Sequence, residues 1–247
     1  MRRFNIFQTS HSALRAQLLD ASLQLQFTNF TKPQQVQHRF DQVIELVLAC
    51  QRQAEEESRY IIPALLVFEK KVPECFAASQ QVRNSPLDRI LDHMLVFDKE
   101  AGSDRANKWA GVLFRASFRK LSDWVIQAMQ RQEEMLNPLL WKHYSDDALY
   151  MLQLRIEGKQ PLSEWLELCS WMIKDMDDED IAIWLNSMES GLPAPVFELL
   201  LEKILGQLPL LKWDMVEERK REERRREEWK KEEWKREEWK KEYGVVL

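Results

Sequence analysis

The chain of 247 residues contains little glycine and proline, with only six glycines and nine prolines to interrupt helices. No segment shows the alternation of apolar and polar residues that is typical of a strand with one buried face. Long stretches rich in leucine, alanine, glutamate, glutamine and lysine favour helices instead. The sequence therefore predicts an all-α protein, and its hydrophobic content of 45% is ample for a buried core.

Cysteine is scarce as well. Cys50, Cys75 and Cys169 are odd in number and no two of them form a CxxC pair, which favours buried thiols in a reducing compartment over disulfides or a zinc site. The N-terminal residues include two arginines but no apolar stretch of a signal peptide. No segment reaches the roughly 18 apolar residues that a membrane-spanning helix needs. We expect a cytoplasmic protein that has no membrane partner.

Basic charge is not concentrated in any region of the sequence. The 36 basic and 41 acidic residues are interleaved and the net charge is -5, so no basic face is available for nucleic-acid phosphates. The sequence also contains no glycine-rich phosphate loop, no G-x-S-x-G, no H-E-x-x-H and no Cys/His pair at a suitable spacing. These absences argue against nucleic-acid binding and against enzyme activity.

Four long amphipathic helices are predicted at about residues 6–27, 33–63, 73–97 and 107–140. Each segment repeats apolar residues at steps of three and four, which places them on one face of a helix. Such helices with modest connections make an up-down-up-down four-helix bundle. The predicted inward residues, helix by helix, are Phe7, His11, Leu14, Leu18, Ala21 and Leu25; Val43, Leu46, Cys50, Gln53, Glu57 and Tyr60; Phe76, Gln80, Asn84, Leu87, Leu91 and Leu95; and Phe114, Phe118, Leu121, Val125, Met129, Glu133, Leu136 and Leu140.

Two further parts follow this predicted bundle. Ser145 is a predicted N-cap, and glycines and prolines then separate shorter helices expected at about 146–157, 161–174, 178–190 and 195–207. We interpret the chain as three parts: 1–145, the bundle; 146–210, a helical annex packed on the bundle; and 211–247, a low-complexity charged helical tail.

The tail repeats five residues between Glu217 and Lys241, as EERKR, EERRR, EEWKK, EEWKR and EEWKK. Glutamates precede basic residues by three or four positions, where each ion pair stabilises a helix by about 0.2 to 0.5 kcal/mol. A step of five residues turns about 140° around a helix, so Trp229, Trp234 and Trp239 do not form one stripe. This spread argues against a coiled coil and a membrane-surface helix. We expect a solvated helix, with a spacer or a repeat expansion without function as alternatives.

Several polar residues occupy predicted inward positions of the four helices. Burying polar groups is costly unless they are hydrogen-bonded, paired or metal-bound. Pairs at a spacing of four bring two side chains to one point, which is how helical bundles build metal sites. The pattern therefore predicts a polar site, or the remains of one, in the core of the bundle. The residues are His11, Gln53, Glu57, Gln80, Asn84 and Glu133.

These positions resemble the metal ligands of the hemerythrin-like (HHE cation-binding) domain family. In that family a four-helix bundle holds two irons through a His on the first helix, H-x3-E on the second, H-x3-H on the third and H-x4-E/D on the fourth. NIFQTSH places His11 at the first ligand, and AEEESRYIIPAL places Glu57 at the glutamate and Gln53 at the histidine of the second helix. QRQEEMLNPLLWKHYSDDAL resembles the end of the fourth helix, with Glu133 at the carboxylate and Ala128 at the histidine position.

The resemblance implies a degenerate member of the family. On the third helix the two histidine positions fall on Gln80 and Asn84, so only His11, Glu57 and Glu133 remain as candidate metal ligands. One imidazole and two carboxylates cannot fill two coordination spheres, so we expect no di-iron cofactor. The resemblance covers about residues 4–150. WMIKDMDDEDIAIWL and GLPAPVFELL resemble the helical extension of a bacterial subgroup and take it to about residue 208.

Another alignment places His93 on the third helix, because LDHML resembles the DHxxL of the family. The residue four positions earlier is then Arg89, and a cation is a poor second ligand. Pro86 would also disturb the turn before it, so we favour the first alignment. The isolated His38 and His143 are explained by surface or helix-end positions.

Three hypotheses about function follow. The first is a bundle that has lost metal binding, holds no cofactor and acts as a structural or protein-interaction module, with amides hydrogen-bonding the remaining carboxylates and imidazole. The second keeps one metal, such as iron, at His11, Glu57 and Glu133 for oxygen, iron or redox sensing. The third is an adaptor that binds a protein partner through an exposed apolar patch around tryptophans of the annex, Trp165, Trp171 and Trp184.

Overall fold

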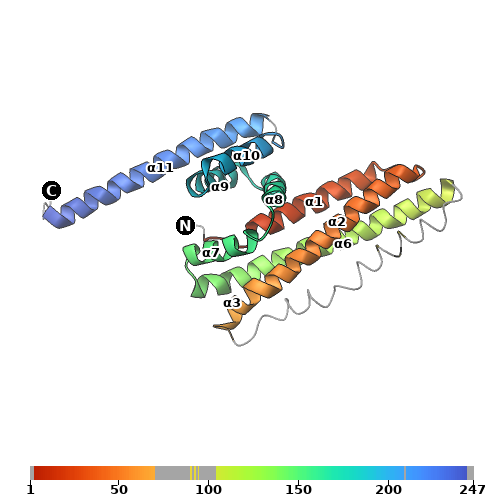
Figure 1. Cartoon of the computed structure of the whole chain (residues 1–247), viewed down its shortest axis with the longest axis horizontal. Helices are drawn as coiled ribbons and strands as arrows, with labels where there is room; N and C mark the ends of the chain where they lie inside the picture. Colours follow the sequence, from red (N-terminus) through yellow and green to blue (C-terminus); the bar gives the residue numbers. More distant parts are fainter. Residues whose placement is uncertain are drawn as a thin grey trace. The chain divides into compact units, whose positions relative to one another are not determined.

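The structure, a computed structural model, describes residues 3–69, 90, 92, 94, 104–208 and 210–243. This part of the chain is mostly helical and contains no strand (Figure 1), which confirms the predicted all-α class. The chain forms two compact units, Met1–Met172 and Ile173–Leu247, and each is described by itself. Whether residues 1–145, 146–210 and 211–247 act as separate parts stays a prediction.

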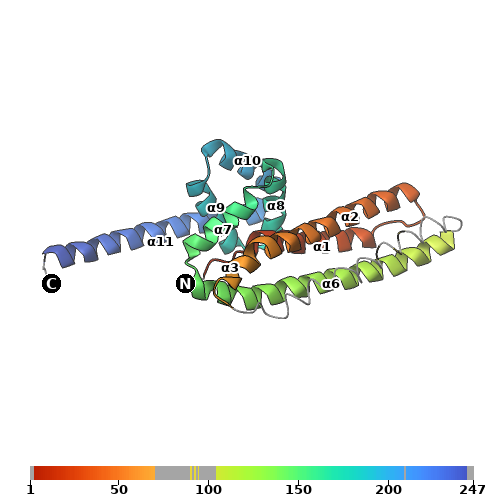
Figure 2. The same cartoon turned by 60° about the horizontal axis from the view of Figure 1, so that its bottom comes forward.

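Three long helices of the first unit pack side by side: α1 (Gln8–Gln26), α2 (Pro33–Glu56) and α6 (Asp104–His143). The sequence colours in Figures 1 and 2 show that α1 runs antiparallel to both α2 and α6. These bounds confirm the predicted first and fourth helices and the predicted start of the second. Shorter helices follow as α7 (Asp146–Glu157) and α8 (Leu162–Asp175), and Ser145 caps α7 by accepting a hydrogen bond from the Ala148 N–H at 3.2 Å.

The second helix does not end at Pro63, contrary to the prediction. It continues through one π-helical turn, η1 (Glu57–Ile61), into α3 (Ile62–Leu66). In this turn the N–H of Ile62 donates to the carbonyl of Glu57, five residues earlier. Proline lacks an N–H and its ring clashes with the carbonyl four residues earlier in a regular α-helix. We attribute the continued helix to the wider π turn, which relieves that clash.

Two apolar clusters fill the core of the first unit. One surrounds Leu18 and Phe118, and the other surrounds Phe7 and Leu140. The predicted apolar stripes of α1, α2 and α6 supply most of the first cluster, but only Phe7, Leu136 and Leu140 of the second. Ile90 and Met94 also lie in the first cluster, although the predicted stripe of residues 73–97 did not include them. The remainder of that predicted helix lies outside the described residues.

The second unit contains α9 (Asp178–Gly191), α10 (Ala194–Leu205) and α11 (Leu210–Tyr243). Asp177 caps α9 by accepting a hydrogen bond from the Asp180 N–H at 2.8 Å. Residues 211–243 of the predicted tail thus belong to one continuous helix, α11, whose first turns pack along α9 (Figure 1). Fully buried residues that include Leu185, Leu200 and Val216 form the core of this unit.

The three tryptophans of the predicted annex are all half-buried. Trp165 donates its indole N–H to Glu157 at 2.9 Å, and Trp171 donates to Glu167 at 3.0 Å. Trp184 belongs to the other unit. The partner-binding hypothesis needed these rings exposed, so their partial burial weighs against it. Among the described helices, none has the length and apolar character to cross a membrane.

Candidate functional site

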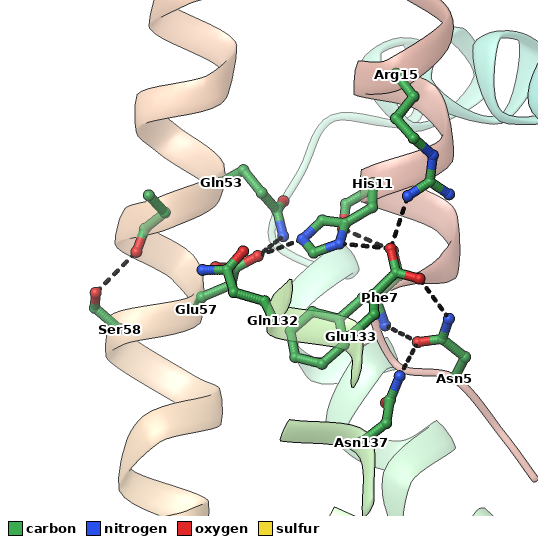
Figure 3. A network of polar contacts seen from close by, with 12 residues as sticks. Asn5, Phe7, His11, Arg15, Gln53, Glu57, Ser58, Gln132, Glu133 and Asn137 are labelled. Carbon is green, nitrogen blue, oxygen red and sulfur yellow. Dashed lines mark hydrogen bonds and ion pairs between the residues drawn. The ribbon is translucent and has the colours of Figure 1, made fainter. Parts of the chain in front are cut away.

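His11, Glu57 and Glu133 meet in one layer of the first unit, between its two apolar clusters (Figure 3). His11 lies on α1 and its side chain is fully buried. Its Nε2 is 2.7 Å from Oε1 of Glu57, the first residue of the π turn, and its Nδ1 is 2.8 Å from Oε1 of Glu133 on α6. The imidazole therefore lies between two carboxylates that contact opposite sides of the ring.

The Glu57 carboxylate accepts hydrogen bonds at both oxygens. Besides His11, Gln53 Nε2 donates to Oε1 at 3.1 Å, and Gln132 Nε2 donates to Oε2 at 3.0 Å. Glu57 is only 2% exposed. These three donors compensate for the loss of water around a buried carboxylate.

The Glu133 carboxylate is less buried and has a cationic neighbour in addition to His11. Nη1 of Arg15 lies 2.7 Å from its Oε1, and Asn5 Nδ2 lies 3.4 Å from its Oε2. Arg15 is one turn beyond His11 on α1. Arg15 and His11 thus each lie within hydrogen-bond distance of a carboxylate of this layer, and this pairing offsets the cost of burying charged groups.

The residues that precede α1 close one side of this layer. Asn5 accepts hydrogen bonds at its Oδ1 from the Phe7 N–H at 3.0 Å and from Asn137 Nδ2 at 2.9 Å. The Phe7 ring stacks on the His11 imidazole, with ring centroids 5.0 Å apart and planes 25° apart. These contacts fix the orientation of the imidazole.

The two carboxylates stabilise the protonated imidazole. Burial lowers the pKa of His11, but the hydrogen bonds and charges of Glu133 and Glu57 raise it, and the pKa lies above its usual 6.5. Burial raises the pKa of Glu133, but hydrogen bonds and charges of His11 and Arg15 outweigh it and lower that pKa from 4.5 to about 2. The two carboxylates therefore favour the imidazolium form of His11, in which its two N–H groups donate to Glu57 and Glu133.

These donors do not fit the di-iron centre that the family resemblance implies. A histidine binds a metal through a bare ring nitrogen, and both nitrogens of His11 are hydrogen-bonded to carboxylates. Among the residues that the structure describes, no group of three or more His, Cys, Asp and Glu side chains is arranged to hold a metal ion. The predicted third-helix positions, Gln80 and Asn84, and the alternative His93 lie outside these residues. A metal role for His11, Glu57 and Glu133 stays a prediction.

The sequence identified only part of this network. Gln53 was predicted to face the site and does, whereas Gln132, Arg15 and Asn5 were missed. Ala128 is half-buried and its side chain offers no polar atom.

The other two described histidines match their expected positions. His38 is exposed, and His143 lies at the end of α6. His143 Nε2 is 2.8 Å from Glu69 Oε1, and its ring stacks on Phe68 with centroids 4.6 Å apart. Neither histidine belongs to the buried layer.

Comparison of the chain with protein-family models, with curated proteins and with solved structures gave no match. The hemerythrin-like resemblance therefore rests on the residues and motifs of the sequence itself.

Proposed function

We propose that this protein is a degenerate hemerythrin-like four-helix bundle that has exchanged its metal centre for a hydrogen-bonded polar layer. It acts as a structural or protein-interaction module and not as an enzyme. The observation that carries the proposal is His11, whose two ring nitrogens are both hydrogen-bonded to carboxylates, at 2.7 and 2.8 Å.

The direction of the helices supports the bundle. α2 and α6 run the same way, and an up-down-up-down bundle needs an antiparallel helix between them, which the predicted third helix at 73–97 would supply. Ile90 and Met94 of this segment lie in the apolar core of the unit, although the stripe predicted for the third helix did not include them.

The replaced ligands support the loss of metal. An amide keeps the hydrogen-bonding capacity of an imidazole but has little affinity for iron. Gln53, at the histidine position of the second helix, donates to Glu57 at 3.1 Å. This amide thus holds the carboxylate as part of the polar layer, in the place where the family resemblance puts an iron ligand.

Anaerobic titration of the purified chain with ferrous iron, followed by desalting and metal analysis, tests the proposal. We expect a colourless protein with far less than one iron per chain. Two tightly bound irons per chain would overturn the loss of the di-iron centre.

The meeting of His11, Glu57 and Glu133 also favours a second candidate, a single-metal site for oxygen, iron or redox sensing. To bind a metal, His11 would have to give up a proton and a hydrogen bond to one carboxylate. The variant Glu57→Ala separates the candidates, with exposed Glu134→Ala as its control. Metal uptake of one ion per chain that Glu57→Ala abolishes and Glu134→Ala retains would establish the second candidate. Under our proposal Glu57→Ala changes stability alone.

A further inference from the structure

The long helix α11 has a clamped part and an outer part. In the clamped part, Val216 is fully buried, and Lys220 Nζ lies 2.7 Å from Oε2 of Glu189 on α9. Arg224 pairs with the same carboxylate, and Asn186 Nδ2 donates to the Lys220 carbonyl at 3.4 Å. These contacts hold the first turns of α11 against α9.

The outer part follows Arg224. Every described side chain at 225–226 and 228–235 is exposed, and the large rings of Trp229 and Trp234 are 61% and 62% exposed. Figure 1 shows this part of α11 continuing past α9 and α10 of the same unit. No glycine or proline occurs between Pro209 and Gly244. Packing against a core therefore does not explain why the described outer part is helical.

The pattern of charged residues explains why the outer part of α11 is helical. The first glutamate of each five-residue block has basic residues both three and four positions ahead, the favourable orientation on a helix. Arg221 and Glu217 form one such pair at 3.1 Å. Starting a helix is the costly step, whereas lengthening one is not. The clamped part is already helical because it packs against α9, so the outer part needs no nucleation of its own. Weak ion pairs are then enough to continue the helix.

The described side chains of the outer part form no continuous apolar face. Trp229 and Trp234 are turned about 140° apart around the helix, so they form neither a coiled-coil seam nor an apolar face for a membrane surface. We propose that the outer part of α11 is a self-supporting rigid spacer, fixed to α9 at Glu189. At about 1.5 Å per residue it holds its end at Tyr243 roughly 28 Å beyond Arg224.

Distances between paired spin labels in the full chain test this spacer. The spin labels are attached to residues other than cysteine, so that the three native cysteines are not labelled as well. For labels at Glu218 and Lys235, 17 residues apart, we expect one narrow distribution near 26 Å at physiological salt. The variant Lys230→Pro should broaden and shorten it, because proline interrupts a helix. A broad distribution in the parent chain, or no difference between parent and variant, would overturn the spacer.

A second label pair, at Ser187 on α9 and Lys235, tests the clamp. The variant Glu189→Lys places a third positive charge beside Lys220 and Arg224, so we expect the Ser187–Lys235 distribution to widen while the Glu218–Lys235 distribution stays narrow. Widening of both would show that the outer part depends on α9 for its helical structure, which contradicts a self-supporting spacer. An unchanged Ser187–Lys235 distribution would show that Glu189 does not hold α11 against α9.

Discussion

At the scale of single residues, the buried carboxylate of Glu57 accounts for much of the stability of the polar layer. The variant Glu57→Gln leaves His11 without a charged partner at Nε2, and the new amide has one acceptor oxygen for the three former donors. Removing one partner of a buried ion pair costs about 3 to 5 kcal/mol, so we expect the free energy of unfolding in urea to fall by that amount. Exposed Glu134→Gln is the control and should change it by less than about 0.5 kcal/mol. Equal effects would contradict a structural layer.

The protonation of His11 and Glu133 predicts how stability depends on pH. Folding raises the pKa of His11 above 6.5, so its contribution is complete below pH 6.5 and is lost as the pH rises through the folded pKa. Folding lowers the pKa of Glu133 from 4.5 to about 2, so its contribution is complete above pH 4.5 and is lost as the pH falls towards 2.

We therefore expect the free energy of unfolding to be highest between about pH 4.5 and 6.5. Urea denaturation across pH 3 to 8 measures it. In His11→Gln the decline between pH 6.5 and 8 should become much shallower. If the free energy of unfolding declines as much in this variant as in the parent chain, a titratable group other than His11 causes the decline.

The sequence predicts only part of the polar layer at this scale. Periodicity placed His11, Glu57 and Glu133 on inward faces, and the structure brings them together. Gln132 was missed because the predicted stripe stepped four residues from Met129 to Glu133, whereas a step of three also points inward on a helix. Asn5 lies before the first helix and contacts Glu133 across 128 positions of sequence, a distance that no local pattern encodes.

At the scale of elements, Gly111 sets how closely α6 approaches the loop between α1 and α2. A Cβ at this position would lie 2.4 Å from Cγ and 2.9 Å from Cβ of buried Phe30. Gly111→Ala should gain at most about 1 kcal/mol of helix propensity and lose about 1 to 3 kcal/mol by overpacking. Overpacking is the larger effect, so we expect a lower melting temperature.

Gly206→Ala is the matched control, because the nearest atoms to a Cβ there are 3.8 Å away. Without a clash, alanine leaves stability unchanged or raises it by up to about 1 kcal/mol. If both variants raise the melting temperature, the packing of Phe30 against Gly111 is wrong.

Helix positions were more predictable than helix irregularities. Apolar spacing located α1, α2 and α6, and Ser145 correctly marked the start of α7. Pro63 was interpreted as the end of a helix, because local rules treat proline as a stop. The π turn at Glu57–Ile61 was not predicted, because the spacing of apolar residues does not distinguish a π turn from an α-helical turn.

At the scale of the whole molecule, the amino-acid composition alone predicted the fold class. Few glycines, few prolines and long helix-favouring stretches predicted an all-α protein, and the described residues confirm it. The two compact units were not predictable, because the boundary at Met172 falls within α8 and not at a glycine or proline. The proposed loss of iron also rests on more than composition, because it depends on which atoms surround His11.

The protonation state of the His11 ring tests this account most directly. Nitrogen NMR of the intact chain with labelled histidine, assigned by the signals missing in His11→Gln, reports both ring nitrogens at pH 7. We predict that Nδ1 and Nε2 are both protonated and that added ferrous iron leaves their signals unchanged. A bare ring nitrogen, or signals that shift or broaden when iron is added, would contradict a layer held by hydrogen bonds in place of metal.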